Sequence, residues 1–407
     1  MKGKGKGCVV SKLANSQTRK LADSPRIGID VTAAVTQGGG IGRYTRELVW
    51  ALAEADKTTA YHLFHAKMPA SPPVPNPLPT AANMRRHPAP LSDRWLYRLW
   101  HRLRVPLPVN WFTGPIDLYH SPDFVLPPVR GGVPTLLTVH DLSFIHYPQT
   151  FTPALVAYLN RVVPASVARA THILADSQAT RADLIDLWQV PETKITVLYS
   201  GVSEKFRPVT EKRRLAAVRD RYGLGESPYL LSVGTLQPRK NYQMLVRAFK
   251  GVAAQWPHNL YIAGGKGWLY EEMMAEVAAQ GLRERVKFLG FVDDADLPTL
   301  YSAATLFLFP SLYEGFGLPL LEAMACGVPV VSAATSSLVE VAGQAAWLLP
   351  PRDERAWQDT MHRLLLDTPR RTKMVAEGFR QAHRFTWRET ARQLLTIYRR
   401  LLKRYEV

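Results

Sequence analysis

The sequence is poor in cysteine and has no long uncharged run of apolar residues. Its 407 residues include two cysteines, Cys8 and Cys326, which are too few for a disulfide framework and favour a reducing, cytoplasmic location. No apolar run reaches the ~18 to 20 residues that a helix needs to cross a bilayer. The Lys-rich start of the chain has no apolar segment of the kind found in secretory signals, so we expect a disordered basic tail over residues 1–25.

Acidic residues are also scarce, with 34 Asp and Glu against 51 Lys and Arg and a net charge of +17. This excess indicates an anionic partner, which is a nucleic acid, an anionic lipid or a phosphorylated substrate. Zinc-ligand spacing, aromatic RNA-binding motifs and helix-turn-helix patterns are missing, so a nucleic-acid-binding protein is an alternative that rests on charge alone. No catalytic base dyad or nucleophile elbow is present either.

Strand-like and helix-like segments alternate in two series, which is typical of parallel sheets with crossover helices. The strands of the first series are expected at residues 25–31, 117–122, 134–141, 171–177 and 195–202. Those of the second are expected at 229–235, 259–265, 286–292, 305–311, 328–334 and 345–351. We predict an α/β protein with one Rossmann-like domain over 26–206 and another over 207–386. The Pro-rich span 68–90 is predicted to be a loop, and 387–407 an amphipathic helix.

Two glutamates flank a tight turn in "SLYEGFGLPLLEAMACGVPVV". Glu314 follows a short apolar run that is typical of a buried strand, and Glu322 lies about one turn into the next helix. Open α/β sheets bind ligands at the carboxyl ends of their strands. We therefore expect both carboxylates to face one ligand. The alternative is that Glu314 is a solvated turn residue and Glu322 a solvated helix residue.

Two loops between a strand and a helix have the residues of a phosphate site. In "TQGGGIGRY", Gly40 and Gly42 let the backbone approach an anion at the start of a helix. As a dinucleotide fingerprint this is weak, because Thr45 stands where the third glycine belongs, and an ordinary glycine-rich loop stays equally open. In "VGTLQPRKN", the adjacent cations Arg239 and Lys240 are suited to neutralising a diphosphate.

In this order, "GGGIGRY", "VHDLSFIHYP", "VGTLQPRKN" and "EGFGLPLLE" resemble the motifs of retaining glycosyltransferases of family 4. The resemblance covers residues 26–407 and implies a GT-B fold, in which two Rossmann-like domains face each other across a central cleft. The first domain would take the acceptor and the second a sugar-nucleotide donor. Residues 387–407 would cross back to the first domain. The motifs are most similar to those of bacterial mannosyltransferases, which favours GDP-mannose as the donor.

The resemblance also assigns catalytic roles to four residues. Glu314 would hold hydroxyls of the donor sugar, and His140 would lie near the transferred sugar. Arg239 and Lys240 would stabilise the leaving diphosphate. Many relatives carry an arginine where this chain has Thr235, so the neutralisation would depend more heavily on these two cations.

Further residues are assigned to donor binding. Glu322 would hold the ribose, and Gly40 would approach the diphosphate from the other domain. Backbone amides of Phe316, Gly317 and Leu318 would contact the sugar and the diphosphate. A sugar-nucleotide epimerase of the same fold is the alternative enzyme class. The acceptor implied is a glycan or a polyprenyl-linked sugar in cell-surface polysaccharide synthesis.

One short motif has the form of a metal site. In "DDADL", Asp294 and Asp296 form an Asp-x-Asp pair just before a helix-like segment, where aspartates commonly cap helices. We expect a cap here and no metal or cofactor, since fixed cations can stabilise a leaving diphosphate on their own.

The span 94–104 combines tryptophan, leucine and arginine at helical spacing. Its apolar residues share one predicted helix face and are Trp95, Leu96, Leu99, Trp100 and Leu103. Such a helix either docks on its own domain or lies on an anionic lipid surface. With the net charge, the second interpretation predicts a peripheral enzyme on the inner membrane face.

Overall fold

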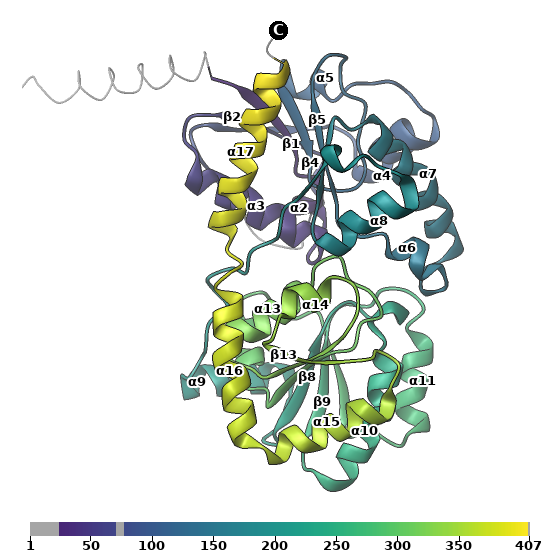
Figure 1. The fold of residues 1–407 in the computed structure, drawn as a ribbon, viewed down its shortest axis with the longest axis vertical. Helices are drawn as coiled ribbons and strands as arrows, with labels where there is room; N and C mark the ends of the chain where they lie inside the picture. Colours follow the sequence, from purple (N-terminus) through teal and green to yellow (C-terminus); the bar gives the residue numbers. More distant parts are fainter. Residues whose placement is uncertain (1–23, 71–76, 406–407) are drawn as a thin grey trace, which may run out of the picture.

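The computed structural model describes residues 24–70 and 77–405. These residues form two domains, and each domain has one parallel sheet with helices on both faces (Figure 1). The predicted basic tail therefore lies almost wholly outside the described residues, as does Cys8. The first sheet has the order β3-β2-β1-β4-β5-β6-β7 and the second the order β10-β9-β8-β11-β12-β13. Both are doubly wound, so the prediction of two Rossmann-like domains is confirmed.

The first domain contains seven strands. They are β1 (Arg26–Asp30), β2 (Ala60–His65), β3 (Met84–Pro88), β4 (Leu118–Ser121), β5 (Thr135–Val139), β6 (His172–Ala175) and β7 (Ile195–Val197). Its helices are α2 (Thr32–Thr36), α3 (Ile41–Ala55), α4 (Asp93–Tyr97), α5 (Asn110–Thr113), α6 (Ser143–His146), α7 (Pro153–Arg169) and α8 (Gln178–Trp188). A π-helical turn, η1 (Arg98–Arg102), follows α4.

The second domain contains six strands. They are β8 (Tyr229–Val233), β9 (Asn259–Ala263), β10 (Val286–Gly290), β11 (Leu306–Phe309), β12 (Val330–Ala333) and β13 (Ala346–Leu349). Its helices are α9 (Lys212–Tyr222), α10 (Tyr242–Gln255), α11 (Glu271–Ala279), α12 (Leu297–Ser302), α13 (Leu318–Ala325), α14 (Ser337–Ala342), α15 (Glu354–Leu366) and α16 (Thr368–Ala382). The last helix is α17 (Trp387–Tyr405).

The Pro-rich span 68–90 is not only a loop, because β3 lies within it and pairs with β2 in parallel. The prediction of a loop is therefore wrong for Met84–Pro88. β3 is the edge strand of the sheet and bonds to a partner on one side only. An edge strand tolerates exposed charges such as Arg85 and Arg86, and Pro88 at its end. The strand therefore lacks the apolar signal of a central strand.

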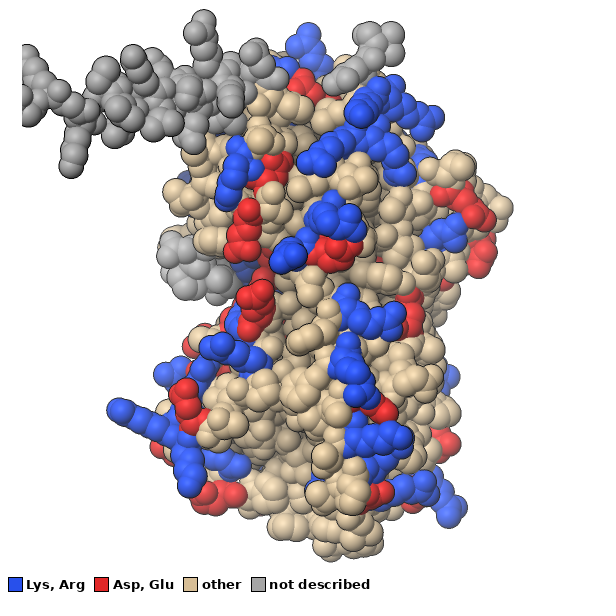
Figure 2. Space-filling model, turned by 60° about the vertical axis from the view of Figure 1, so that its left-hand side comes forward, with Lys and Arg blue, Asp and Glu red and all other residues tan. Residues whose placement is uncertain are grey.

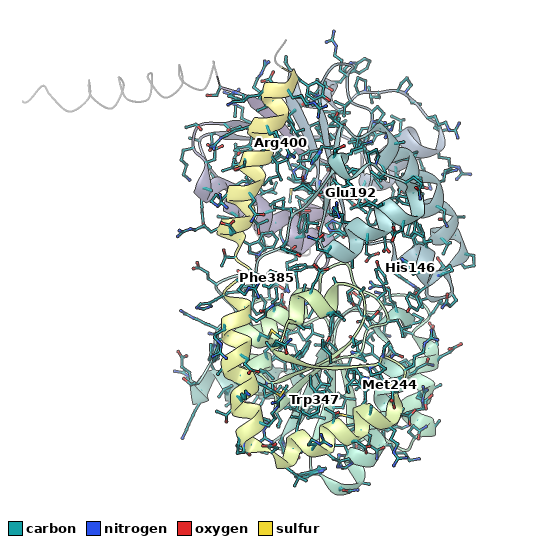
Figure 3. All side chains as sticks on the ribbon, viewed as in Figure 1. His146, Glu192, Met244, Trp347, Phe385 and Arg400 are labelled. Carbon is teal, nitrogen blue, oxygen red and sulfur yellow. The ribbon has the colours of Figure 1, made fainter. Side chains whose placement is uncertain are left out.

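The last helix belongs to the first domain in space, although it follows the second in sequence (Figure 1). Its inner face, including Leu394 and Tyr398, packs in one core with Leu48 of α3. The Tyr398 hydroxyl lies 2.7 Å from Nδ1 of the buried His120 on β4. Figure 3 shows Arg400 on this helix beside the first domain, and Phe385 where the chain passes between the domains.

The predicted single apolar face over residues 94–104 is wrong. Leu96 and Trp100 are buried, at 3% and 9% exposure, whereas Trp95 and Leu103 are 55% and 66% exposed. Leu103 directly follows the π-helical turn, which has more residues per turn than an α-helix and so rotates the side chains after it, whereas Trp95 precedes that turn in α4. One part of the segment thus docks on its own domain and another part faces outward, with Arg98 over the Trp95 ring.

The basic charge is distributed rather than gathered on the face seen in Figure 2, where Lys and Arg cover both halves and Asp and Glu lie among them. None of the helices formed by residues 24–70 and 77–405 combines the length and the apolar character needed to cross a membrane.

The passage of the chain back to the first domain leaves no room for a side chain at Gly201. A Cβ there would lie 2.0 Å from the backbone nitrogen of Trp387. We expect Gly201→Ala to lower the free energy of unfolding by about 1–3 kcal/mol, the usual cost of overpacking, as measured by urea denaturation. Gly131→Ala is the matched control, because a Cβ at Gly131 meets nothing within 4 Å. Equal stability of the two variants would contradict this close approach.

Candidate active site

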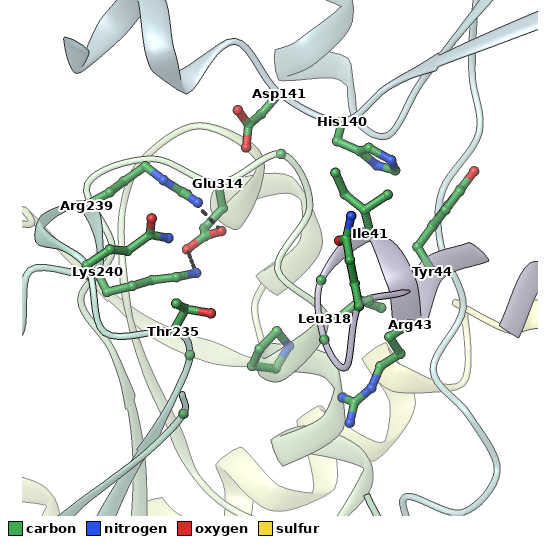
Figure 4. Close-up of a pocket in the computed structure, with 18 of the residues that line it drawn as sticks. Ile41, Arg43, Tyr44, His140, Asp141, Thr235, Arg239, Lys240, Glu314 and Leu318 are labelled. Carbon is green, nitrogen blue, oxygen red and sulfur yellow. Dashed lines mark hydrogen bonds and ion pairs between the residues drawn. The ribbon is translucent and has the colours of Figure 1, made fainter. Parts of the chain in front are cut away.

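A cavity of about 740 Å³ lies between the two domains, where the carboxyl ends of both sets of strands meet. Its walls come from the loop before α3, the end of β5, the loops after β8 and β9, and the turn between β11 and α13. Ligands of open α/β sheets bind in this position. In Figure 4, Arg239 and Lys240 point toward Glu314, and Ile41, Arg43 and Tyr44 of α3 lie across the cavity.

The structure brings most of the predicted site residues together. Those that line the cavity are Gly40, His140, Arg239, Lys240, Glu314, Phe316, Gly317 and Leu318. Glu322 is the exception, because it does not line the cavity and is only 2% exposed.

Glu314 is bound by both predicted cations. Its carboxylate lies 2.5 Å from Lys240 Nζ and 3.1 Å from Arg239 Nη1. All three side chains are about nine-tenths buried, so the alternative of a solvated turn carboxylate is wrong. Burial opposes ionisation of Glu314, but Lys240 and Arg239 prevail and lower the pKa of its carboxyl to about 2. Three charged groups thus form one buried cluster with one net positive charge.

The turn that carries Glu314 is held against both domains. A Cβ at Gly315 would lie 2.0 Å from the carbonyl oxygen of His140, so only glycine allows this approach of the two backbones. Gly317 has φ +107°, a conformation that side chains disfavour. Ser337 Oγ donates to the carbonyls of Glu314 and Phe316, at 2.9 and 3.0 Å. The predicted glycines therefore serve the geometry of the turn.

His140 is paired with a carboxylate that the sequence prediction missed. Nδ1 lies 2.6 Å from the Asp176 carboxylate, and Nε2 lies 3.2 Å from the carbonyl oxygen of Pro122. Burial alone would lower the pKa of His140, but Asp176 outweighs it and raises that pKa to about 9. His140 is then an imidazolium at neutral pH. Asp176 directly follows β6, the neighbour of β5, so its position at the same sheet edge was a usable signal.

Glu322 is covered by Arg43, a second residue that sequence reasoning missed. Arg43 Nη1 lies 2.5 Å from one carboxylate oxygen of Glu322, and the Tyr301 hydroxyl donates to the other at 3.0 Å. Arg43 lies in the first turn of α3, where the positive end of the helix dipole disfavours a cation. Two carboxylates of the second domain, Glu322 and Asp294, bind this guanidinium.

The predicted capping role of the Asp-x-Asp pair is wrong, because neither side chain caps α12. Asp294 binds Arg43 and also Lys205, the latter at 3.2 Å. Asp296 accepts hydrogen bonds from Arg221 at 2.6 Å and from the Tyr222 hydroxyl at 2.9 Å. Both carboxylates therefore bind side chains of neighbouring segments and not the backbone amides at the start of α12. Within the described ranges, no three His, Cys, Asp or Glu residues are grouped so as to hold a metal ion.

Comparisons with known proteins agree with this geometry. The model of Glycosyltransferase Family 4 matches residues 38–206, and that of Glycosyl transferases group 1 matches residues 217–381. The chain is 33% identical to the O-antigen chain mannosyltransferase B of Escherichia coli over 89% of this chain and 96% of that protein. The chain belongs to glycosyltransferase family 4.

Other members and structures extend the comparison. A D-inositol 3-phosphate glycosyltransferase of Salinispora tropica is 33% identical over 70% of this chain and 64% of that protein. The solved sucrose-phosphate synthase of Thermosynechococcus elongatus superposes with a TM-score of 0.74 at 24% identity, over 93% of this chain and 99% of that one. The predicted GT-B fold of this family 4 glycosyltransferase is therefore confirmed.

The buried charge cluster makes Glu314 a stability determinant of this glycosyltransferase. We expect Glu314→Gln to lower the free energy of unfolding by about 3–5 kcal/mol at pH 7, because Lys240 and Arg239 are left buried without their counter-ion. Urea denaturation measures this. Glu192→Gln is the control, since Glu192 pairs with Arg181 on the surface with its side chain 70% exposed, and such pairs contribute below about 1 kcal/mol.

The lowered pKa of Glu314 fixes how its contribution to the stability of the fold changes with pH. The folded pKa of Glu314 lies below its ordinary value of 4.5, so its contribution is fully present above that pH and is lost as the pH falls through about 2. The difference in stability between wild type and Glu314→Gln should therefore be constant from pH 7 to 5 and shrink below pH 4.5. A difference that vanishes by pH 5 would contradict the cluster.

Proposed function

We propose that this glycosyltransferase is a retaining, metal-independent hexosyltransferase that moves mannose from GDP-mannose to a glycan or polyprenyl-linked acceptor in cell-surface polysaccharide synthesis. The observation that carries the proposal is the cluster of Glu314, Arg239 and Lys240 in the cleft, opposite the glycine loop of α3. The donor sugar rests on similarity to the O-antigen chain mannosyltransferase B.

The electrostatics of the cluster suit a leaving diphosphate. Glu314 neutralises only one of its two cations, so one positive charge is available for the diphosphate as its bond to the sugar breaks. Arg239 Nε is buried and has no hydrogen-bond partner among the described residues, which leaves a donor for an incoming oxygen. Fixed donors in a site of low dielectric stabilise developing charge without reorganisation. No metal is required in this scheme.

The charge states of Glu314 and His140 support retention. Glu314 is held between two cations, and His140 is protonated at neutral pH through Asp176. Neither group is suited to take the proton of the acceptor hydroxyl. In the proposed step, the bond from the anomeric carbon to the diphosphate oxygen breaks and the bond to the acceptor oxygen forms on the same face. The acceptor proton passes to the leaving diphosphate oxygen.

Donor binding requires one rearrangement. The proposed ribose contact of Glu322 is occupied by Arg43 and Tyr301. We propose that Arg43 leaves Glu322 when the nucleotide binds, since a ribose hydroxyl and the guanidinium cannot share the same oxygen. Arg43 lines the cavity, so the released guanidinium stays close to the donor phosphates.

The membrane contact belongs to the same proposal. Trp95 and Leu103 are exposed by more than half and lie among the arginines of the 94–104 span. Trp111, which is 77% exposed, adds a further aromatic side chain to the first domain. Exposed tryptophan beside arginine fits the interface of an anionic bilayer. We infer that these exposed side chains of the first domain hold the enzyme on the inner membrane, where a polyprenyl-linked acceptor resides.

The donor prediction is tested by thermal unfolding with sugar nucleotides. GDP-mannose at about 100 times its Kd should stabilise the native state by about 2.7 kcal/mol, and UDP-glucose at the same concentration should stabilise it less. Glu322→Gln should weaken this effect, while the surface control Glu192→Gln should not. Lys240→Met should lower transfer from GDP-mannose by about 10²-fold or more.

Two outcomes would contradict this proposal. One is a loss of transfer in excess chelator that magnesium or manganese restores. The other is a product with the inverted anomeric configuration, as read from the coupling constants in its NMR spectrum. Conversion of the donor sugar without any acceptor would instead support the epimerase.

Membrane binding is tested with vesicles. The protein should sediment with vesicles containing phosphatidylglycerol and not with neutral phosphatidylcholine vesicles, because each cation near an anionic surface contributes about 1 kcal/mol. Higher salt should weaken binding. Joint replacement of Trp95 and Arg98 by Ser should weaken it at least tenfold, whereas Trp50→Ser, also at an exposed tryptophan, should not. Equal binding to both kinds of vesicle would refute an anionic contact.

A further inference from the structure

A second cavity, of about 510 Å³, lies in the first domain beside the cleft. The two cavities share four lining residues, namely Gln37, Asp123, Val125 and Tyr158. The two cavities are therefore direct neighbours. The volume lies within the range of about 300–1,000 Å³ that is usual for small-molecule sites.

Two carboxylates line this second cavity. Asp30, at the end of β1, accepts hydrogen bonds from the Thr32 backbone amide at 3.0 Å and from the Tyr119 hydroxyl at 3.2 Å. Asp123 accepts one from the Phe124 amide at 2.7 Å. An ionised carboxylate has about four lone-pair sites, so both side chains keep acceptor capacity toward the cavity. No cation pairs with either carboxylate within the described part of the chain.

Aromatic rings also line this cavity. Tyr97 of α4 meets Tyr158 of α7 edge to face, with ring centroids 4.7 Å apart, and both line the cavity. Trp100 lies beside them and donates its indole N–H to the carbonyl of Leu107 at 2.8 Å. Ring faces offer an apolar surface with little conformational freedom to lose. Carboxylates and aromatic rings in one cavity match a sugar ring, which has hydroxyls around its edge and C–H groups on its faces.

Asp123 connects this cavity to the proposed transfer site. It lies at the boundary of both cavities, next to Pro122, whose carbonyl oxygen is 3.2 Å from His140 Nε2. The Phe124 ring on its other side has its centroid 6.1 Å from that of His140. A sugar hydroxyl bound at Asp123 would thus lie beside the proposed position of the transferred sugar.

Resting on the proposed function, we propose that the second cavity is an acceptor subsite for the penultimate hexose of an oligosaccharide. The terminal hexose would lie at Asp123 and offer its hydroxyl to the donor. Asp30 would accept hydrogen bonds from hydroxyls of the next hexose, which would pack on Tyr97 and Tyr158. Arg94 and Arg98 line the same cavity, so its lining has hydrogen-bond donors as well as acceptors. The enzyme would then extend a chain of at least two sugars.

The test compares acceptors of increasing length. With GDP-mannose as donor, the KM for a methyl mannobioside should be at least tenfold lower than for methyl mannoside, and a mannotrioside should gain little more. Asp30→Asn and Tyr97→Ala should each bring this ratio of KM values close to one. Asp186→Asn, at an exposed position on α8, is the matched control and should keep the full ratio. Thermal unfolding of each variant establishes that it is folded.

Equal KM values for mannoside and mannobioside in the wild type would overturn the subsite, as would a full ratio in both folded cavity variants. Failure of the proposed function is distinguishable, because no variant would then turn over GDP-mannose. In that case, calorimetric titration with the mannotrioside still tests whether the subsite binds a sugar. Binding to the wild type that weakens at least tenfold in Tyr97→Ala supports the subsite, and absence of binding to the wild type overturns it.

Discussion

The cleft depends on one interaction, the burial of the Glu314 carboxylate between Lys240 and Arg239. A charge removed from water is tolerated only when an opposite charge lies close to it. This requirement ties the turn before α13 to the loop before α10, two segments far apart in sequence. It also explains why Ser336 and Ser337 hold the backbone of the same turn. Stability and the proposed chemistry thus draw on the same three side chains.

Polar contacts hold the two domains together across the cleft. Arg43 reaches Glu322, and the Glu340 carboxylate accepts hydrogen bonds from the first backbone amides of α8, at 3.0 and 3.1 Å. A carboxylate at a helix amino end is stabilised by the exposed amides and the helix dipole. A polar contact of this kind can be replaced by a contact to a ligand, whereas an apolar contact in the core cannot. The proposed displacement of Arg43 by a nucleotide is one exchange of this kind.

The sequence predicts the second domain better than the first, for a physical reason. Central parallel strands such as β11 are buried on both faces and appear as short apolar runs between turns. In the first sheet, His62 interrupts the apolar run of β2, and β3 is a polar edge strand. Neither strand appears in the sequence as an apolar run between turns. In the site, a strand end and a glycine turn located Glu314, whereas His140 came from the resemblance to family 4. Arg43 and Asp176 act through partners on distant segments, and only the position of Asp176 at the end of β6 was a usable signal.

The return of α17 makes the first domain discontinuous along the chain. Its 19 residues complete a core that begins at β1, with the whole second domain inserted between them. Two covalent connections cross between the domains, one after β7 and one before α17, and they touch at Gly201 and Trp387. A chimera with another first domain would therefore have to exchange two separate pieces of sequence, because a single junction would leave the foreign core without its last helix.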